Sequence, residues 1–187
     1  MNITKVISAM TEYFSGDPKR VGHFLKVYAF SKTIGEAEKL SAENQEILEI
    51  AAAVHDIGIK KSEELYGSSS GKYQEMLGPD EAEKLLNKLG VDEKIIERVC
   101  FLVGHHHTYN MIDGLDYQIL VEADFLVNAY EDNLSKDAIV NVRNKLFKTK
   151  TATKTLNDIF ALENNQNDKS HSVFLKYQLR KTLWLAL

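Results

Sequence analysis

The 187-residue sequence contains a single cysteine, Cys100, and only two prolines, Pro18 and Pro79. One cysteine cannot form a disulfide within the chain, which excludes a disulfide-stabilised secreted scaffold. No apolar run approaches the roughly 18–20 residues that a membrane span needs. The N-terminal residues also lack the charged start and apolar stretch of a secretory signal. We therefore expect a cytoplasmic protein with no membrane partner.

Basic charge is also scarce. The 23 lysines and arginines are outnumbered by 27 acidic residues, for a formal net charge of −4. Since duplex nucleic acids are bound through a basic surface, a duplex partner is not expected. With 44% hydrophobic residues the chain can build a core of its own, and it is too short for two comfortable domains. We expect one domain over residues 1–187.

Strand-like alternation is nearly absent, which predicts an all-α fold. Each proline stands where a helix could begin, because Pro18 follows Asp17 and Pro79 precedes two acidic residues. A glycine- and serine-rich stretch at 66–72 predicts a flexible loop. Hydrophobic periodicity predicts helices near 3–14, 18–37, 43–57, 79–89, 92–107, 115–131, 135–147 and 172–186, and another at 150–163.

Histidine and aspartate side chains occupy the apolar faces of three predicted helices. His23 lies on the stripe of helix 18–37, His55 on that of helix 43–57, and Asp124 on that of helix 115–131. Asp56 follows His55 directly. Each alone is more often a hydrogen-bonded core residue or an internal ion pair than a ligand. Burying all of them without a shared partner would be destabilising, so we predict a bound metal ion.

Three consecutive histidines end the predicted helix 92–107. His106 and His107 end two neighbouring apolar stripes, whereas His105 continues a line that faces outward. We therefore expect His106 and His107, but not His105, to face the same interior as the other histidines.

The order His23, His55-Asp56 and Asp124 resembles the HD-domain metal-dependent phosphohydrolase superfamily, over roughly residues 18–135, with additional C-terminal helices in 136–187. The resemblance implies an HD-domain-like helical bundle in which His23, His55, Asp56 and Asp124 bind one divalent cation. Such a mixed nitrogen and oxygen site is compatible with Mn²⁺, Fe²⁺, Co²⁺, Ni²⁺, Zn²⁺ or Mg²⁺. It further implies that metal-activated water cleaves a phosphomonoester, phosphodiester or anhydride bond of a small nucleotide or other phosphorylated metabolite.

Segment 104–108 is similar to the diadenosine-polyphosphate-cleaving branch, which implies that His106 or His107 binds a second metal ion, contacts phosphate or protonates the leaving group. That branch has a histidine where this chain has Leu77, so a complete second site is in doubt. Glu75 could substitute for it or be exposed. We expect Asp56 and His106 to be catalytic.

Many relatives have a lysine directly after His-Asp-Ile-Gly, where this chain has Ile59. Lys60 follows one position later, and it either orients the substrate as a catalytic group or stabilises the helix end.

Further cations are expected to bind the substrate. Lys72 in the glycine-serine loop could belong to a lid. Arg143 and Lys148 belong to a basic segment that either lines the mouth of the site or is a solvated helix end.

Two other functions remain alternatives. A non-catalytic metal-binding or ligand-sensing module could keep the bundle without turnover, and a di-iron oxygenase would need a complete second metal site. The sequence also leaves open whether the chain forms a homodimer.

Overall fold

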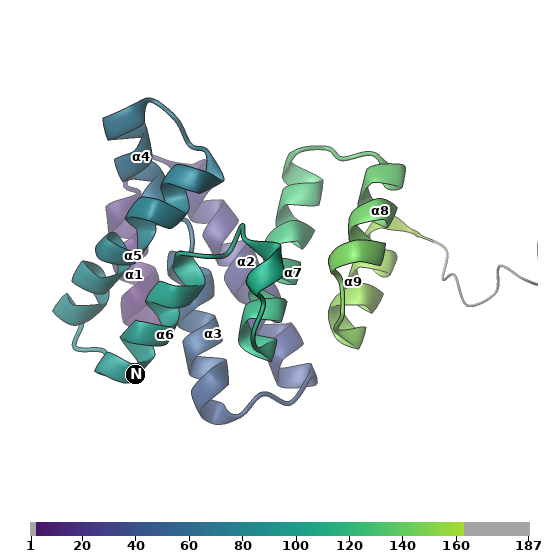
Figure 1. The fold of residues 1–187 in the computed structure, drawn as a ribbon, viewed down its shortest axis with the longest axis horizontal. Coiled ribbons are helices and arrows are strands. Elements are labelled where there is room, and N and C mark those ends of the chain that lie inside the picture. Colours follow the sequence, from purple (N-terminus) through teal and green to yellow (C-terminus); the bar gives the residue numbers. More distant parts are fainter. Residues whose placement is uncertain (1–2, 163–187) are drawn as a thin grey trace, which may run out of the picture.

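The computed structural model describes residues 3–162, and within them every regular element is a helix. The predicted all-α class is therefore confirmed. The helices pack together as a bundle, with α8 and α9 beside α7 at one end (Figure 1). Their bounds are α1 Ile3–Tyr13, α2 Pro18–Ala37, α3 Ala42–Val54, α4 Gly58–Tyr66, α5 Gly71–Lys88, α6 Glu93–Val103, the 3-10 helix η1 Tyr109–Met111, α7 Leu115–Glu131, α8 Lys136–Leu146 and α9 Lys150–Phe160.

Helix α3 lies at the centre of the bundle. Every residue from 47 to 54 is buried, and α1, α2, α6 and α7 all pack against this helix. A helix that is apolar around its whole circumference is stable only when neighbours cover every side. The one charged residue in this run, Glu49, accepts hydrogen bonds from Lys32 and Gln45. The packing places the C-terminal end of α3, and the residues that follow it, inside the molecule.

Helices α2 and α7 begin and end where the sequence predicts, at 18–37 and 115–131. Asp17 caps α2 by accepting a hydrogen bond from the backbone N–H of Arg20, 3.0 Å away. Other predicted helices are found with ends shifted by up to four residues, among them α1, α6, α8 and α9. The predicted helix 172–186 lies outside the described residues.

The region after α3 differs from the prediction. Helix α3 ends at Val54 rather than at 57, and the short helix α4, which the sequence did not predict, begins at Gly58. The predicted loop shortens to residues 67–70, and α5 begins at Gly71 and continues through Pro79 instead of starting there. A Cβ atom on Gly58 would lie 2.6 Å from the backbone oxygen of Gln74, so α4 and α5 approach too closely for a side chain. This tertiary packing outweighs the local preference of proline for a helix start.

The pair α8 and α9 is fixed to α7 by a buried carboxylate. Glu122 is fully buried and accepts hydrogen bonds from the backbone N–H groups of Lys148 and Thr149, from the Thr149 hydroxyl and from the Gln118 amide. A buried carboxylate is tolerated when its oxygens are satisfied in this way.

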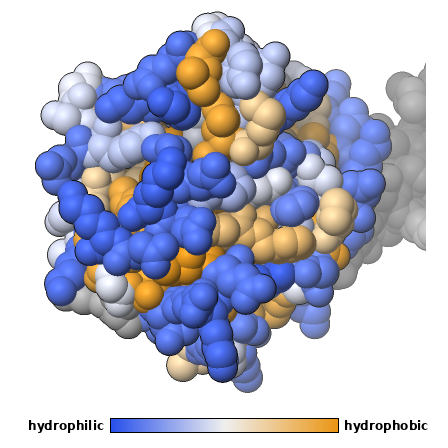
Figure 2. All heavy atoms as spheres, turned by 60° about the vertical axis from the view of Figure 1, so that its left-hand side comes forward, coloured by the Kyte–Doolittle hydropathy of each residue, from blue (hydrophilic) through white to orange (hydrophobic). Residues whose placement is uncertain are grey.

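The surface in Figure 2 is mostly hydrophilic, with apolar side chains in short bands between charged ones. Such scattered apolar groups are normal for a protein surface. Within residues 3–162, no helix has both the length and the apolar character that crossing a membrane requires.

Candidate metal centre

The turn between α3 and α4 presents two adjacent polar side chains to the interior. It is closed by hydrogen bonds from Ile57 N to Val54 O, at 2.9 Å, and from Ile59 N to Asp56 O, at 3.0 Å. His55 is fully buried, and its Nδ1 lies 2.9 Å from the backbone oxygen of Ala52. Since a carbonyl oxygen only accepts, Nδ1 carries the proton, and the neutral ring presents a lone pair at Nε2.

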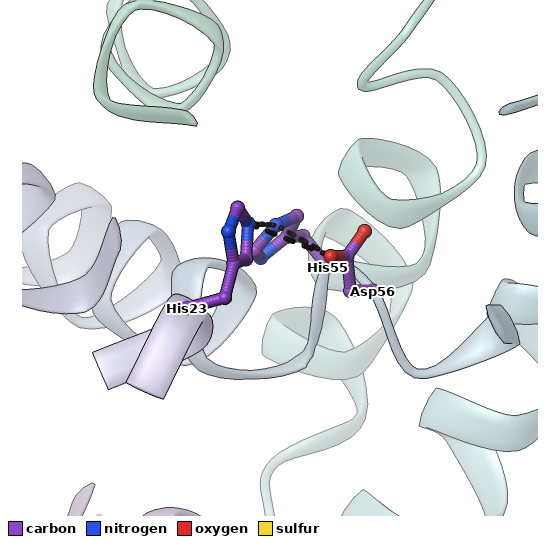
Figure 3. A group of neighbouring side chains, drawn as sticks. All are labelled: His23, His55 and Asp56. Carbon is purple, nitrogen blue, oxygen red and sulfur yellow. Dashed lines mark hydrogen bonds and ion pairs between the residues drawn. The ribbon is translucent and has the colours of Figure 1, made fainter. Parts of the chain in front are cut away.

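Side chains from two other helices meet this turn. His23 from α2 places its Nε2 3.3 Å from Nε2 of His55 and 3.5 Å from Oδ2 of Asp56, so that the three side chains point toward one another (Figure 3). Asp124 from α7 places Oδ1 3.2 Å from Nε2 of His23 and 3.5 Å from Nε2 of His55. The structure therefore brings together the four ligands expected from the sequence, from three separate segments.

His23, His55 and Asp56 have ligand atoms within 4.8 Å of one another and could hold a metal ion, and Asp124 lies beside both histidines. His23 donates from Nδ1 to Glu131, 2.9 Å away, so its neutral ring also presents a lone pair at Nε2. In this neutral state, which metal binding requires, two nitrogen lone pairs and two carboxylate oxygens face one another. Around a cation with bonds of about 2.1 Å, neighbouring ligand atoms are roughly 3.0–3.4 Å apart. The observed spacings of 3.2–3.5 Å fit a metal ion.

The charge states of the cluster lead to the same conclusion. Burial lowers the pKa of His55, but the Asp56 carboxylate and a hydrogen bond to Asp124 outweigh burial and raise it to about 9. Burial raises the pKa of Asp124, but hydrogen bonds from His23 and His55 outweigh it and hold the pKa well below its usual range. Without a cation, the buried carboxylates therefore keep protons on the imidazoles. A divalent cation would displace those protons.

His106 and His107 extend the cluster. His106 is buried, and its Nδ1 lies 2.8 Å from the backbone oxygen of Val103. Its Nε2 is buried, 3.6 Å from Oδ1 of Asp56, and has no hydrogen-bond partner among residues 3–162. Such an orphaned atom is a site for a ligand that is not a protein group. Asp56, His106 and His107 have ligand atoms within 4.8 Å of one another and could hold a second metal ion.

The cluster opens into a pocket of about 370 Å³, a size typical of small-molecule sites. Its lining includes two cations that sequence reasoning did not select, Lys19 and Arg20, which lie one helical turn before His23. Arg20 is held by Asp17 and by Glu63 of α4. The spacing of three and four residues from His23 could have indicated both, because such residues share a helix face. The lining residues are Asp17, Lys19, Arg20, His23, Asp56, Ile59, Ser69, Gln74, His107, Asp124, Asn128, Glu131 and Asp132.

A sequence model of the HD domain matches residues 20–144, more than half of the chain. The chain belongs to the HD domain family. The structure is also similar to the crystal structure of a predicted HD superfamily hydrolase from an uncultured Thermotogales bacterium, which agrees with an HD fold. The two share 24% sequence identity with a TM-score of 0.60, over 97% of this chain and 99% of that one. No curated protein matches the sequence.

Several substrate contacts expected from the sequence are not brought to the pocket of this HD domain. Lys60 donates to the backbone oxygen of Tyr13, with its ammonium 5.1 Å from the centre of that ring, in a separate pocket between α1 and α5. Arg143, also expected to bind substrate, is buried, donates to Asn157 of α9 and does not line the pocket. Among residues 3–162, Lys72 and Lys148 are exposed and do not line the pocket either.

The neighbours of the triple histidine have structural roles in the HD domain. His105 turns toward Phe101 and stacks on its ring at 4.4 Å, which agrees with its predicted outward line. Glu75 accepts hydrogen bonds from the backbone of His107 and from the Thr108 hydroxyl, both at 2.9 Å. Glu75 therefore fixes the turn that carries the histidines, and it does not replace the histidine that is absent at Leu77.

Proposed function

We propose that this HD domain is a metal-dependent phosphohydrolase that cleaves a phosphoester or phosphoanhydride bond of a small phosphorylated metabolite, such as a nucleotide. The observation that supports this most strongly is the convergence of four lone-pair donors at the base of an open pocket. Family membership supports the same class of reaction.

His23, His55, Asp56 and Asp124 would hold the cation. When bound, a divalent cation lowers the pKa of water and neutralises charge that develops on a phosphoryl oxygen. The two aspartates cancel the charge of the cation, so the centre does not repel the cations of the pocket. The buried histidines, each fixed through Nδ1 by a hydrogen bond, keep their Nε2 atoms aimed at one point.

Substrate binding is assigned to the pocket wall formed by α2. Lys19 and Arg20 supply positive charge in a pocket that is otherwise rich in carboxylates, and a phosphoryl group needs such counter-charges. Arg20 is pre-oriented because Asp17 and Glu63 hold its guanidinium.

The orphaned Nε2 of His106 lies behind the pocket lining, 3.6 Å from Oδ1 of Asp56, and is assigned to the reaction through this contact. It either donates a proton to the leaving oxygen or binds a second cation together with Asp56 and His107. Burial, helped by the neighbouring His106, lowers the pKa of His107 to about 4. His107 is therefore neutral near pH 7, where it can accept a hydrogen bond or bind a metal but cannot serve as the acid.

The test is a screen of metal-stripped protein for phosphate release from nucleotides and sugar phosphates, with each divalent metal added back. We expect release with at least one substrate and one metal, and none without metal. Lys19→Met should raise KM for that substrate, whereas Lys94→Met, an exposed lysine on α6, should leave it unchanged. If metal binds stoichiometrically and no phosphorylated compound turns over, the non-catalytic module replaces this proposal. Two irons per chain would favour an oxygenase.

A further inference from the structure

Glu131, the last residue of α7, joins the metal centre to the surface through His23. Its Oε2 accepts a hydrogen bond from Nδ1 of His23 at 2.9 Å, and its Oε1 accepts one from Lys26. The carboxylate is largely buried, with 14% of the side chain exposed, whereas Lys26 is 45% exposed. Both carboxylate oxygens are therefore engaged.

His23 differs from His55 and His106 in the kind of group that accepts the hydrogen bond from its Nδ1. His55 and His106 each donate from Nδ1 to a backbone oxygen one turn earlier on their own segment. His23 donates instead to a carboxylate from another helix. Glu131 follows Asp124 by seven residues, or two helical turns, so α7 supplies one ligand and also the support for a second ligand.

We propose that Glu131 is a positioning residue that strengthens His23 as a metal ligand; this inference rests on the proposed metal centre. The hydrogen bond fixes the proton on Nδ1 and therefore the lone pair on Nε2, the atom that faces His55 and Asp124. A carboxylate acceptor also increases the electron density of the ring more than a carbonyl does, which strengthens the bond from Nε2 to a cation.

Lys26 completes the arrangement. Its ammonium neutralises Glu131, so that the carboxylate is held toward His23 without adding net charge to the pocket wall. Lys26 does not line the pocket, unlike Arg20, so it is assigned to this support and not to phosphate binding.

The experiment measures the affinity of metal-stripped protein for Zn²⁺ in competition with a chromophoric chelator, and the absorption spectrum of the Co²⁺-loaded protein. Glu131→Ala should weaken Zn²⁺ binding about 10- to 100-fold without changing the stoichiometry, as expected when a metal-bound histidine loses its carboxylate partner. Glu131→Gln keeps an acceptor but loses the charge, so its affinity should lie between those of wild type and Glu131→Ala. Both variants should shift the Co²⁺ bands, which report the ligand field.

The matched control is Glu49→Gln. Glu49 is another largely buried carboxylate, 11% exposed, that is paired with a half-exposed lysine, Lys32, but no histidine of the described chain hydrogen-bonds to it. Its substitution should leave the Zn²⁺ affinity and the Co²⁺ spectrum unchanged, even where it lowers the melting temperature.

The outcomes separate two failures. If wild-type protein bound neither Zn²⁺ nor Co²⁺, the metal centre itself would be wrong, and the role of Glu131 with it. If wild type bound tightly and Glu131→Ala bound equally tightly with an unchanged Co²⁺ spectrum, only the positioning role would be overturned. An equal loss of affinity in Glu49→Gln would also overturn it, because the effect would then be general destabilisation.

Discussion

Nε2 of His23 lies 3.2 Å from Oδ1 of Asp124, although the two residues are 101 positions apart in the chain. The contact exists because α2 and α7 pack against each other and against α3. Neither helix brings a complete set of ligands, so the cation site forms only when these helices have assembled around α3. A metal ion bound by these residues would therefore stabilise the folded bundle.

Removal of a central ligand should abolish metal binding without unfolding the chain. Asp56→Ala and His55→Ala each delete one of the four converging donor atoms, and each should lose most bound metal and most activity. The helical content should stay nearly intact, because the apolar packing of α3 is unchanged. Elemental analysis and circular dichroism of the purified variants would check this. A full metal complement in either variant would mean that the proposed ligands are wrong.

Substitution of two neighbouring histidines, His106 and His105, should have different effects on kcat. His106→Ala removes the orphaned Nε2 beside Asp56 and should lower kcat by about 100-fold or more, with a smaller effect on affinity for the first metal. His105→Ala loses a ring that stacks on Phe101 outside the pocket, so kcat should hardly change. Steady-state kinetics and metal titration of both variants make the comparison. Equal losses in the two variants would contradict the assignment.

Helices α4 and α5 lie so close together that a side chain at position 58 should destabilise the fold. An added Cβ would lie 2.6 Å from the backbone oxygen of Gln74 and 2.9 Å from the backbone nitrogen of Gly78. Gly58→Ala should therefore reduce the free energy of unfolding by about 1–3 kcal/mol.

Gly22→Ala is the matched control, since Gly22 lies inside α2 and an added Cβ would have no atom of the described residues within 4 Å. That variant should gain up to about 1 kcal/mol, because alanine favours a helix more than glycine does. Urea unfolding of both proteins gives the two values. Equal changes of the same sign in the free energy of unfolding would show that the close contact between α4 and α5 does not determine the effect of an alanine at position 58.

The attachment of α9 to α2 should depend on pH through Glu38. Its carboxylate accepts a hydrogen bond from the backbone N–H of Thr151 at 2.7 Å, and hydrogen bonds from Thr151 hold the pKa of Glu38 below its usual range. A lowered pKa in the folded state contributes stability that is present above the unfolded value, near 4.3, and is lost as the pH falls through the folded value.

Glu38→Gln should therefore melt below wild type at pH 7, and the difference should shrink as the pH falls from about 5 towards 3. Thermal unfolding at several pH values would measure this. A difference between the two proteins that did not change with pH would show that the charge of Glu38 contributes nothing.

The sequence predicted which polar side chains converge better than it predicted the lining of the surrounding pocket. A histidine or aspartate on an apolar stripe, as at His23 and Asp124, is visible in a single helix, and the resemblance then grouped those residues. Substrate cations lack such a signal, since a lysine is expected on any exposed face. Arg143 was assigned to substrate because it lies in a basic segment, yet its partner Asn157 becomes a neighbour only when α8 and α9 pack.

Helix ends near the site were the least predictable part of the fold. Pro79 has a strong local preference for a helix start, and only the contact of Gly58 with α5 explains why the helix runs through it. Glu131 could have been found from its spacing to Asp124, since residues seven apart share a face. What singles it out is its contact with His23, which depends on the packing of α2 against α7.

The hydrogen bonds to Glu122 show that the support of α7 extends beyond the matched HD domain. The HD family match ends at residue 144, yet Lys148 and Thr149, which hydrogen-bond to Glu122, lie beyond that boundary. Cutting the chain at 144 would remove the three hydrogen-bond donors that Lys148 and Thr149 supply to Glu122, two residues before Asp124 on the same helix. A fragment that keeps this support of α7 therefore has to extend past the family boundary, at least to Thr149.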